Sequence, residues 1–120
     1  MPQYVDGYIL AVPRKKMGVY RRMASLGGKV WKDHGALDYR ECVADDVKRG
    51  KSTSFPRSVK LKPGEVVVFS YIVFRSRRDR DRVNAKAMKD QRLAKYMDIK
   101  KSPFDPKRMI WGGFKTIVSA

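Results

Sequence analysis

The stretch EVVVFSYIVFR at residues 65–75 decides the fold, because it is the clearest β-strand of the sequence. Successive side chains of a strand point to opposite sides, so alternate positions belong to different faces. One face carries Val67, Phe69, Tyr71 and Val73, and the other carries Val66, Val68, Ile72 and Phe74. Both faces are apolar, so we expect this strand to be buried on both sides of its sheet.

Three further segments alternate in the same way and predict three more strands. They are residues 3–12, residues 36–47 and residues 109–119. The first is mostly apolar on both faces and ends at Pro13. The second sets the carboxyl group of Glu41 among the apolar neighbours Leu37, Tyr39 and Val43.

Residues 14–34 repeat their apolar side chains every three or four positions, which is typical of an amphipathic helix. Gly35 supplies the expected stop. Gly27 and Gly28 lie inside the helix, where each weakens it by roughly 1 kcal/mol relative to alanine. We therefore expect a kink or a close backbone contact at these two positions.

A second helix is predicted from Ser76 to about Asp98, after a long connection at residues 48–64. Ser76 and Asp79 form a start that is similar to a capping box. The predicted inner face of this helix consists of Val83, Ala87, Ala94 and Met97.

The order of elements is β-α-β-β-α-β, which predicts an α+β, ferredoxin-like domain over residues 1–120 with a four-stranded antiparallel sheet. Two helices cover one face of such a sheet, yet three of the strands are apolar on both faces. The chain has no element left for the second face except the long connection. We therefore expect the sheet of a second copy to cover it in a symmetric homodimer.

Short segments along nearly the whole chain match a known family. They are YVDG at 4–7, WKDHGALDY at 31–39, ECVADD at 41–46, TSFP at 53–56, RVNAK at 82–86, PFD at 103–105, KRMI at 107–110 and GGF at 112–114. In these segments the chain resembles the YbaA-like conserved bacterial proteins of unknown function. The resemblance implies a dimeric α+β barrel, an architecture also used by small monooxygenases, and it implies no particular activity.

The charge is the outlying property of the composition, since 28 Lys and Arg face 12 Asp and Glu for a net charge of +16. A field of this sign attracts nucleic acids, acidic membrane surfaces and anionic metabolites. The basic residues are spread along the whole chain, so we favour the interpretation that they form a solvated surface. The sequence leaves open whether the charge also serves nucleic-acid binding.

Cys42 and His34 are the only residues of their kinds. No intramolecular disulfide can form, which fits a reducing, cytoplasmic location. A structural zinc site needs about four Cys or His ligands, so we expect no metal site, and we expect no cofactor. The longest apolar stretch is far shorter than the roughly 20 residues that cross a bilayer, so we expect no membrane contact.

Glu41 is the first candidate for chemistry, because a carboxyl group among apolar neighbours has a raised pKa and can transfer protons. His34 at the end of the first helix and Tyr39 beside Glu41 are the other candidate catalytic residues, with Tyr8 and Trp111 as further lining of one pocket between sheet and helices. The alternatives are a structural ion pair at Glu41 and a helix cap at His34.

A second constellation of ligand-binding candidates consists of Phe104, Asp105, Arg108 and Trp111. It combines an aromatic wall with a guanidinium group that can hold a carboxylate or phosphate by two hydrogen bonds. Gly112 and Gly113 allow a close approach of backbone or ligand. The alternative is a strand whose glycines accommodate a neighbouring aromatic ring.

Basic residues crowd the start of the second helix and are the candidates for nucleic-acid binding. They are Arg75, Arg77, Arg78, Arg80 and Arg82, with two aspartates between them. No RNA-recognition motif accompanies them, so RNA is a less favoured partner.

The leading functional prediction is a homodimer that binds a small, anionic or neutral molecule between sheet and helices, with or without enzymatic activity. The first alternative is a non-catalytic RNA- or nucleic-acid-binding protein that acts through its basic surface. The second is a structural or regulatory dimer.

Overall fold

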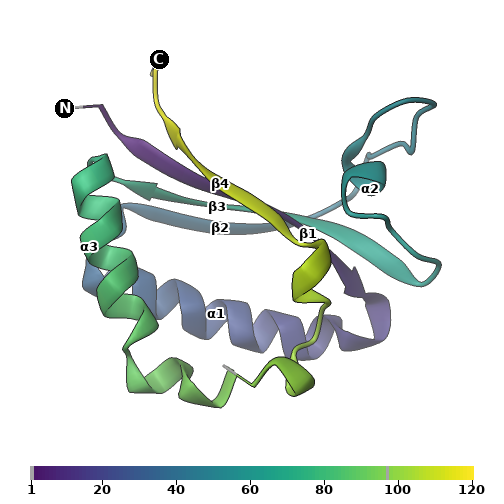
Figure 1. Ribbon diagram of the computed structural model, residues 1–120, viewed down its shortest axis with the longest axis horizontal. Coiled ribbons are helices and arrows are strands. Elements are labelled where there is room, and N and C mark those ends of the chain that lie inside the picture. Colours follow the sequence, from purple (N-terminus) through teal and green to yellow (C-terminus); the bar gives the residue numbers. More distant parts are fainter. Residues whose placement is uncertain (1, 97) are drawn as a thin grey trace.

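A computed structural model describes residues 2–96 and 98–120 and contains one four-stranded antiparallel sheet in the order β2-β3-β1-β4 (Figure 1). The strands are β1 (Tyr4–Pro13), β2 (Asp38–Val43), β3 (Glu65–Phe74) and β4 (Ile110–Lys115). The longer helices are α1 (Met17–His34) and α3 (Arg77–Met88), and α2 (Phe55–Ser58) is a single turn. This confirms the predicted α+β arrangement with the helices α1 and α3 as the two crossovers.

The strand predicted at residues 65–75 is β3, and it pairs with β1 on one side and β2 on the other. The helices α1 and α3 cover one face of the sheet (Figure 1). The core on this side is made of buried residues from the sheet and from both helices, which are Leu10, Val12, Tyr20, Ala24, Val68, Ile72, Phe74 and Val83. No helix in the described part of the chain is both long enough and apolar enough to cross a lipid bilayer.

The two glycines inside α1 mark a close contact, and the helix runs through them unbroken. A Cβ atom added to Gly28 would lie 2.9 Å from Cδ1 of Tyr39, and one added to Gly27 would lie 3.0 Å from its hydroxyl oxygen. The expected stop is confirmed, because Gly35 adopts φ 122° and its N–H bonds to the carbonyl of Lys32 at 3.1 Å.

The second helix is shorter than predicted and ends at Met88. Its start is confirmed, since Oγ of Ser76 accepts the N–H of Asp79 at 3.1 Å. Asp90 ends the helical run, because its carboxylate accepts the backbone N–H of Arg92 and the chain continues as a 3₁₀ helix over Gln91–Tyr96.

Two of the four residues that were predicted for the inner face of the second helix follow Met88 in the sequence and are not part of α3. Ala94 is exposed, and the neighbouring Leu93 is buried in its place. Met97 lies outside the described residues. The strands β2 and β4 are also shorter than predicted, since β2 ends at Val43 and β4 ends at Lys115.

The other face of the sheet is covered only in part. The connection between β2 and β3, which contains α2, packs Val59 and Leu61 against Ala11 and Val67 at one end of this face (Figure 1). The rest exposes large apolar side chains, with exposed fractions of 42% for Phe69, 43% for Ile110 and 63% for Phe114. We call this surface, with Val5, Tyr71 and Val73, the open face of the sheet.

Candidate functional site

A cavity of about 620 Å³ lies between α1 and the edge strand β2. One wall comes from α1 and the other from β2, with β3 contributing at the floor. The lining residues are Met17, Tyr20, Arg21, Ala24, Ser25, Gly28, Lys29, Lys32, Asp38, Tyr39, Glu41, Cys42, Val43 and Val68. The volume is within the range of small-molecule sites.

Glu41 is the central polar group of this cavity. The hydroxyl of Tyr20, from α1, donates to its Oε1 at 2.6 Å, and the hydroxyl of Tyr39, from β2, donates to its Oε2 at 2.8 Å. Across the sheet, Glu41 stands opposite Ser70 of β3, which is itself buried. Both carboxyl oxygens are thus held by hydroxyl groups, and helix and strand are joined at this point.

Burial raises the pKa of the Glu41 carboxyl, and hydrogen bonds from Tyr20, Tyr39 and Ser70 oppose the rise without cancelling it. Burial also raises the pKa of the Tyr20 and Tyr39 hydroxyls far above their usual range, and the nearby Glu41 adds to this rise. The two phenols therefore remain neutral hydrogen-bond donors. A carboxyl group with a raised pKa in such a setting is a candidate for proton transfer.

Tyr39 reaches Glu41 because α1 has no side chains at Gly27 and Gly28. The tyrosine ring lies against the helix backbone at these positions, at distances that leave no room for a Cβ atom at Gly28. This pair of glycines thus sets how closely β2 approaches α1 on this side of the cavity. It also places the Tyr39 hydroxyl in reach of Glu41.

Cations line the same cavity from α1. Arg21, Lys29 and Lys32 are all exposed, and all three contribute to its lining. On the opposite wall the carboxylate of Asp38 is engaged by Arg40, whose Nε lies 3.3 Å from Oδ2. The cavity therefore combines a half-buried carboxyl group with three solvent-exposed cations.

The structure brings Glu41 and Tyr39 together and places His34 elsewhere. Nε2 of His34 lies 2.9 Å from Oδ2 of Asp90, so the ring bridges the ends of α1 and α3. Tyr8 stands across the sheet from Ser70 and stacks on Trp111 with ring centroids 6.3 Å apart. Neither Tyr8 nor Trp111 lines the cavity, although they share its face of the sheet.

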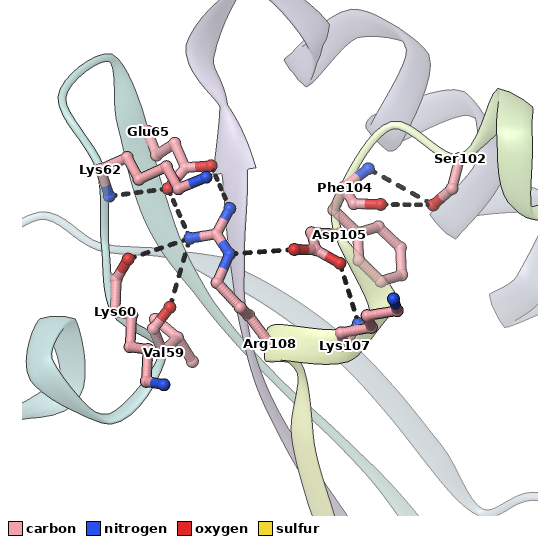
Figure 2. A network of polar contacts seen from close by, with 9 residues as sticks. All are labelled: Val59, Lys60, Lys62, Glu65, Ser102, Phe104, Asp105, Lys107 and Arg108. Atoms are coloured by element: carbon pink, nitrogen blue, oxygen red, sulfur yellow. Dashed lines mark hydrogen bonds and ion pairs between the residues drawn. The ribbon is translucent and has the colours of Figure 1, made fainter.

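The second predicted constellation gathers only in part, since Nε of Arg108 lies 3.3 Å from Oδ2 of Asp105. Figure 2 shows Arg108 between Glu65 and Asp105, where it donates to both oxygens of Glu65 at 2.8 and 2.6 Å. Arg108 also donates to the backbone carbonyls of Val59 and Lys60. This guanidinium group therefore ties the connection to the start of β3.

The aromatic members of that constellation each pack against another aromatic ring. Phe104 packs edge-on against the ring of Tyr20 at 6.0 Å, behind the cavity. Trp111 lies on β4 against Tyr8. Gly113 accommodates an aromatic ring, as the alternative interpretation expected, because a Cβ there would lie 2.6 Å from Cε2 of Tyr4.

The arginines at the start of α3 are largely engaged within the molecule. Arg80 is paired with Asp6 at 3.2 Å and with Asp81 at 3.1 Å, Arg77 with Asp81 at 3.5 Å, and Arg82 with Asp79. Of the five candidates, Arg75 and Arg78 take part in none of the ion pairs formed by the described residues.

Tyr20 and the cations of α1 are the residues that the sequence argument missed. Tyr20 occupies an apolar position of α1 and meets Glu41 only through the tertiary fold. The spacing of Arg21, Ser25, Gly28 and Lys32 is a signal that could have been found, since it places these residues on one side of a helix. Within residues 2–96 and 98–120, no three His, Cys, Asp or Glu side chains gather as a metal site would require.

Two solved structures share this fold. A dimeric ferredoxin-like protein from an uncultured marine organism covers 100% of both chains with 10% identity and a TM-score of 0.57. A putative antibiotic biosynthesis monooxygenase from Nitrosomonas europaea covers 96% of this chain and 90% of its own, with 11% identity and a TM-score of 0.59. At these identities the similarity shows the fold alone.

Sequence relatives are much closer than these structures. The uncharacterized protein YbaA of Escherichia coli strain K12 is 45% identical over 116 residues, which are 97% of each chain, and a protein of the same description from Shigella flexneri matches equally well. Residues 3–106 match the family described as "Protein of unknown function (DUF1428)". The predicted resemblance is thus confirmed, and the chain belongs to the DUF1428 family together with YbaA.

Proposed function

We propose that this protein is a homodimer whose subunits each bind a small molecule in the cavity between α1 and β2, with Glu41 as the polar contact. The observation that carries the proposal is the Tyr20–Glu41–Tyr39 cluster, a half-buried carboxyl group with hydroxyl partners at the wall of a cavity of about 620 Å³. A carboxyl group in this position can bind a donor on a ligand or exchange a proton with it.

The other buried carboxyl groups of the chain show why Glu41 is different. Asp6 and Glu65 each face an arginine, with shortest nitrogen–oxygen distances of 3.2 Å to Arg80 and 2.6 Å to Arg108. The pair with Arg108 lowers the pKa of Glu65, whereas burial still raises the pKa of Asp6 against the opposing effects of Asn84 and Arg80. Glu41 takes part in none of the ion pairs among the described residues, and its hydrogen-bond partners are hydroxyl groups. Its desolvation is therefore only partly offset, which is typical of functional groups.

The open face supports the homodimer. Contiguous exposed apolar surface on a sheet marks a protein interface, and Phe69, Ile110 and Phe114 provide it here. A structure of the same fold is described as dimeric for its own protein. Packing two open faces about 10 Å apart would bury these side chains in the way that sheets pack in sandwiches.

Nucleic-acid binding through the start of α3 has less support, because most of the arginines there are already paired with aspartates. A protein that binds nucleic acid through exposed cations retains it in a strongly salt-dependent manner. Tight, salt-sensitive retention on RNA with no small-molecule binding would favour this alternative.

The proposal is tested by titration with phenyl-naphthylamine, a neutral apolar probe whose fluorescence rises in apolar sites. We expect saturable binding of one probe per chain to the wild type. Ser25→Trp places an indole in the cavity and should abolish binding, because Ser25 lines the cavity. Ala85→Trp on the exposed side of α3 is the matched control and should bind as the wild type does. No saturable binding to the wild type, or equal binding by Ser25→Trp, contradicts the proposal.

A further inference from the structure

The cations of the cavity come from one side of one helix. Arg21, Lys29 and Lys32 lie eight and three residues apart on α1, and the residues between them on this side are Ser25 and Gly28, which also line the cavity. With 3.6 residues per turn this spacing forms a stripe along the helix. The stripe faces β2 across the cavity, so its charges converge on the same volume.

These cations form no ion pairs with the two carboxyl groups that line the same cavity, Asp38 and Glu41. Among the described residues, no ion pair includes Arg21, Lys29 or Lys32. The ammonium group of Lys32 donates to the carbonyl of Leu37 at 2.8 Å, which leaves its charge uncompensated. Three like charges around one cavity raise its positive potential and attract an anion to it.

The lining of the cavity also changes from charged side chains at its mouth to apolar side chains in its inner part. The three cations are exposed and lie at its mouth, whereas Tyr20, Ala24 and Val68 are buried and form its inner part. Glu41 is intermediate in burial, and each of its carboxyl oxygens accepts a hydrogen bond from a tyrosine hydroxyl. A ligand that matches this gradient has an anionic group at one end and an apolar body at the other.

We infer that the ligand of this cavity is a small organic anion. Its apolar body lies between Ala24 and Val68, and its carboxylate, sulfonate or phosphate group is held at the mouth by Arg21, Lys29 and Lys32. A hydroxyl, an N–H or an acidic C–H of the same ligand then faces Glu41. This inference rests on the proposed function, because it names the class of ligand for the same cavity.

Two probes with one ring system test the inference. Anilinonaphthalene sulfonate carries a sulfonate, and phenyl-naphthylamine is its neutral counterpart. At fixed ionic strength we expect the wild type to bind the sulfonate at least about tenfold more tightly than the neutral probe. Arg21→Gln/Lys29→Gln removes two cations from the mouth and should weaken sulfonate binding roughly tenfold, because each exposed charge contact contributes up to about 1 kcal/mol. Binding of the neutral probe should be unchanged.

Lys15→Gln/Arg22→Gln is the matched control. It lowers the net charge by the same amount near the same helix, and neither residue lines the cavity. If the +16 field of the whole molecule attracts the sulfonate, both double variants lose affinity equally, and the inference is overturned. Equal affinity of the wild type for the two probes also overturns it. Both of these results leave the proposed function standing, which fails if Ser25→Trp binds the neutral probe as the wild type does or if the wild type shows no saturable binding of the neutral probe.

Discussion

The hydroxyl of Tyr20 donates a hydrogen bond of 2.6 Å to Oε1 of Glu41 and so joins the first turn of α1 to the edge strand β2. Tyr39 completes the cluster from the same strand as Glu41. The cluster is therefore held by two elements at once, and the position of α1 against the sheet sets its geometry. The predictions below follow from this arrangement and from the open face.

Glu41→Gln should leave the stability of the fold unchanged or raise it. The amide keeps the shape of the carboxyl group and removes a charge that is only partly compensated where it lies. Thermal melting and urea denaturation measure the effect. Glu65→Gln is the matched comparison, because it removes the carboxylate that Arg108 binds with two hydrogen bonds and leaves only Asp105 at 3.3 Å, so it should destabilise by at least about 2 kcal/mol.

A loss of roughly 3 to 5 kcal/mol in Glu41→Gln would show that Glu41 serves a buried structural pair. The cluster would then hold the fold together, and its assignment as a ligand contact would be wrong.

The contribution of Glu41 to the free energy of unfolding should decrease as the pH rises. Burial raises the pKa of this carboxyl above the ordinary value of 4.5, so over the interval between the two values the folded chain binds one proton more than the unfolded chain. The free energy of unfolding therefore falls with increasing pH in that interval. Tyr20 and Tyr39 stay neutral there, because their pKa values are raised by burial.

The measurement is the free energy of unfolding of the wild type and of Glu41→Gln in urea, from about pH 4 to about pH 8. The difference, wild type minus variant, should fall above pH 4.5 and then level off. The other charged groups that line the cavity, Asp38 and the three cations of α1, are present in both proteins, so their contributions cancel in the difference. A difference that is flat or that rises with pH is incompatible with a raised pKa at Glu41.

Gly28→Ala should destabilise the protein, although alanine favours helices. The new Cβ atom would lie 2.9 Å from Cδ1 of Tyr39, so either the ring or the helix must move. We expect a net loss of about 1 to 3 kcal/mol in urea denaturation, together with altered probe binding.

Gly18→Ala tests the same substitution in the same helix where there is room. The atom closest to its Cβ would be Nη1 of Arg22 at 3.8 Å, so stability should be unchanged or slightly raised. Equal effects of the two substitutions would mean that Tyr39 is not held by the glycines.

Phe114→Glu should convert the dimer to a monomer. This side chain is 63% exposed on the open face, so the substitution leaves the core of one subunit intact and places a charge in the proposed interface. Light scattering at micromolar concentration should give twice the chain mass of 13.8 kDa for the wild type and 13.8 kDa for the variant.

Val19→Glu is the control for the dimer, because Val19 is a comparably apolar exposed residue on α1 and lies away from the open face. It should remain dimeric. A wild type that is monomeric at this concentration, or a dimer that persists in Phe114→Glu, contradicts the proposed interface.

The sequence predicted the fold well because β3 is apolar on both faces and β1 mostly so, which is typical of buried strands, and because Gly35 is a clear stop. The end of α3 was missed because the pattern of apolar residues continues past Met88, whereas the turn at Asp90 depends on a side-chain hydrogen bond. The spacing of apolar residues gives no information on side chains that compete with the helix for backbone hydrogen bonds.

The candidate site could be predicted only where neighbours in sequence are also neighbours in space. Tyr39 and Glu41 are two residues apart on one strand and share a face. His34 is close to both in sequence, yet the end of α1 directs it to Asp90 beyond α3. Tyr20 belongs to the site because of how α1 packs on the sheet, which the sequence pattern does not specify.

The most direct test of ligand binding between α1 and β2 is to locate a bound ligand by NMR, with phenyl-naphthylamine and methyl-labelled protein. We expect intermolecular nuclear Overhauser effects from the probe to the methyl groups of Met17, Ala24 and Val43, which line the cavity. Contacts with the methyl groups of Val5, Val73 and Ile110 in place of these would put the ligand on the open face and would contradict the assignment of the cavity as the functional site.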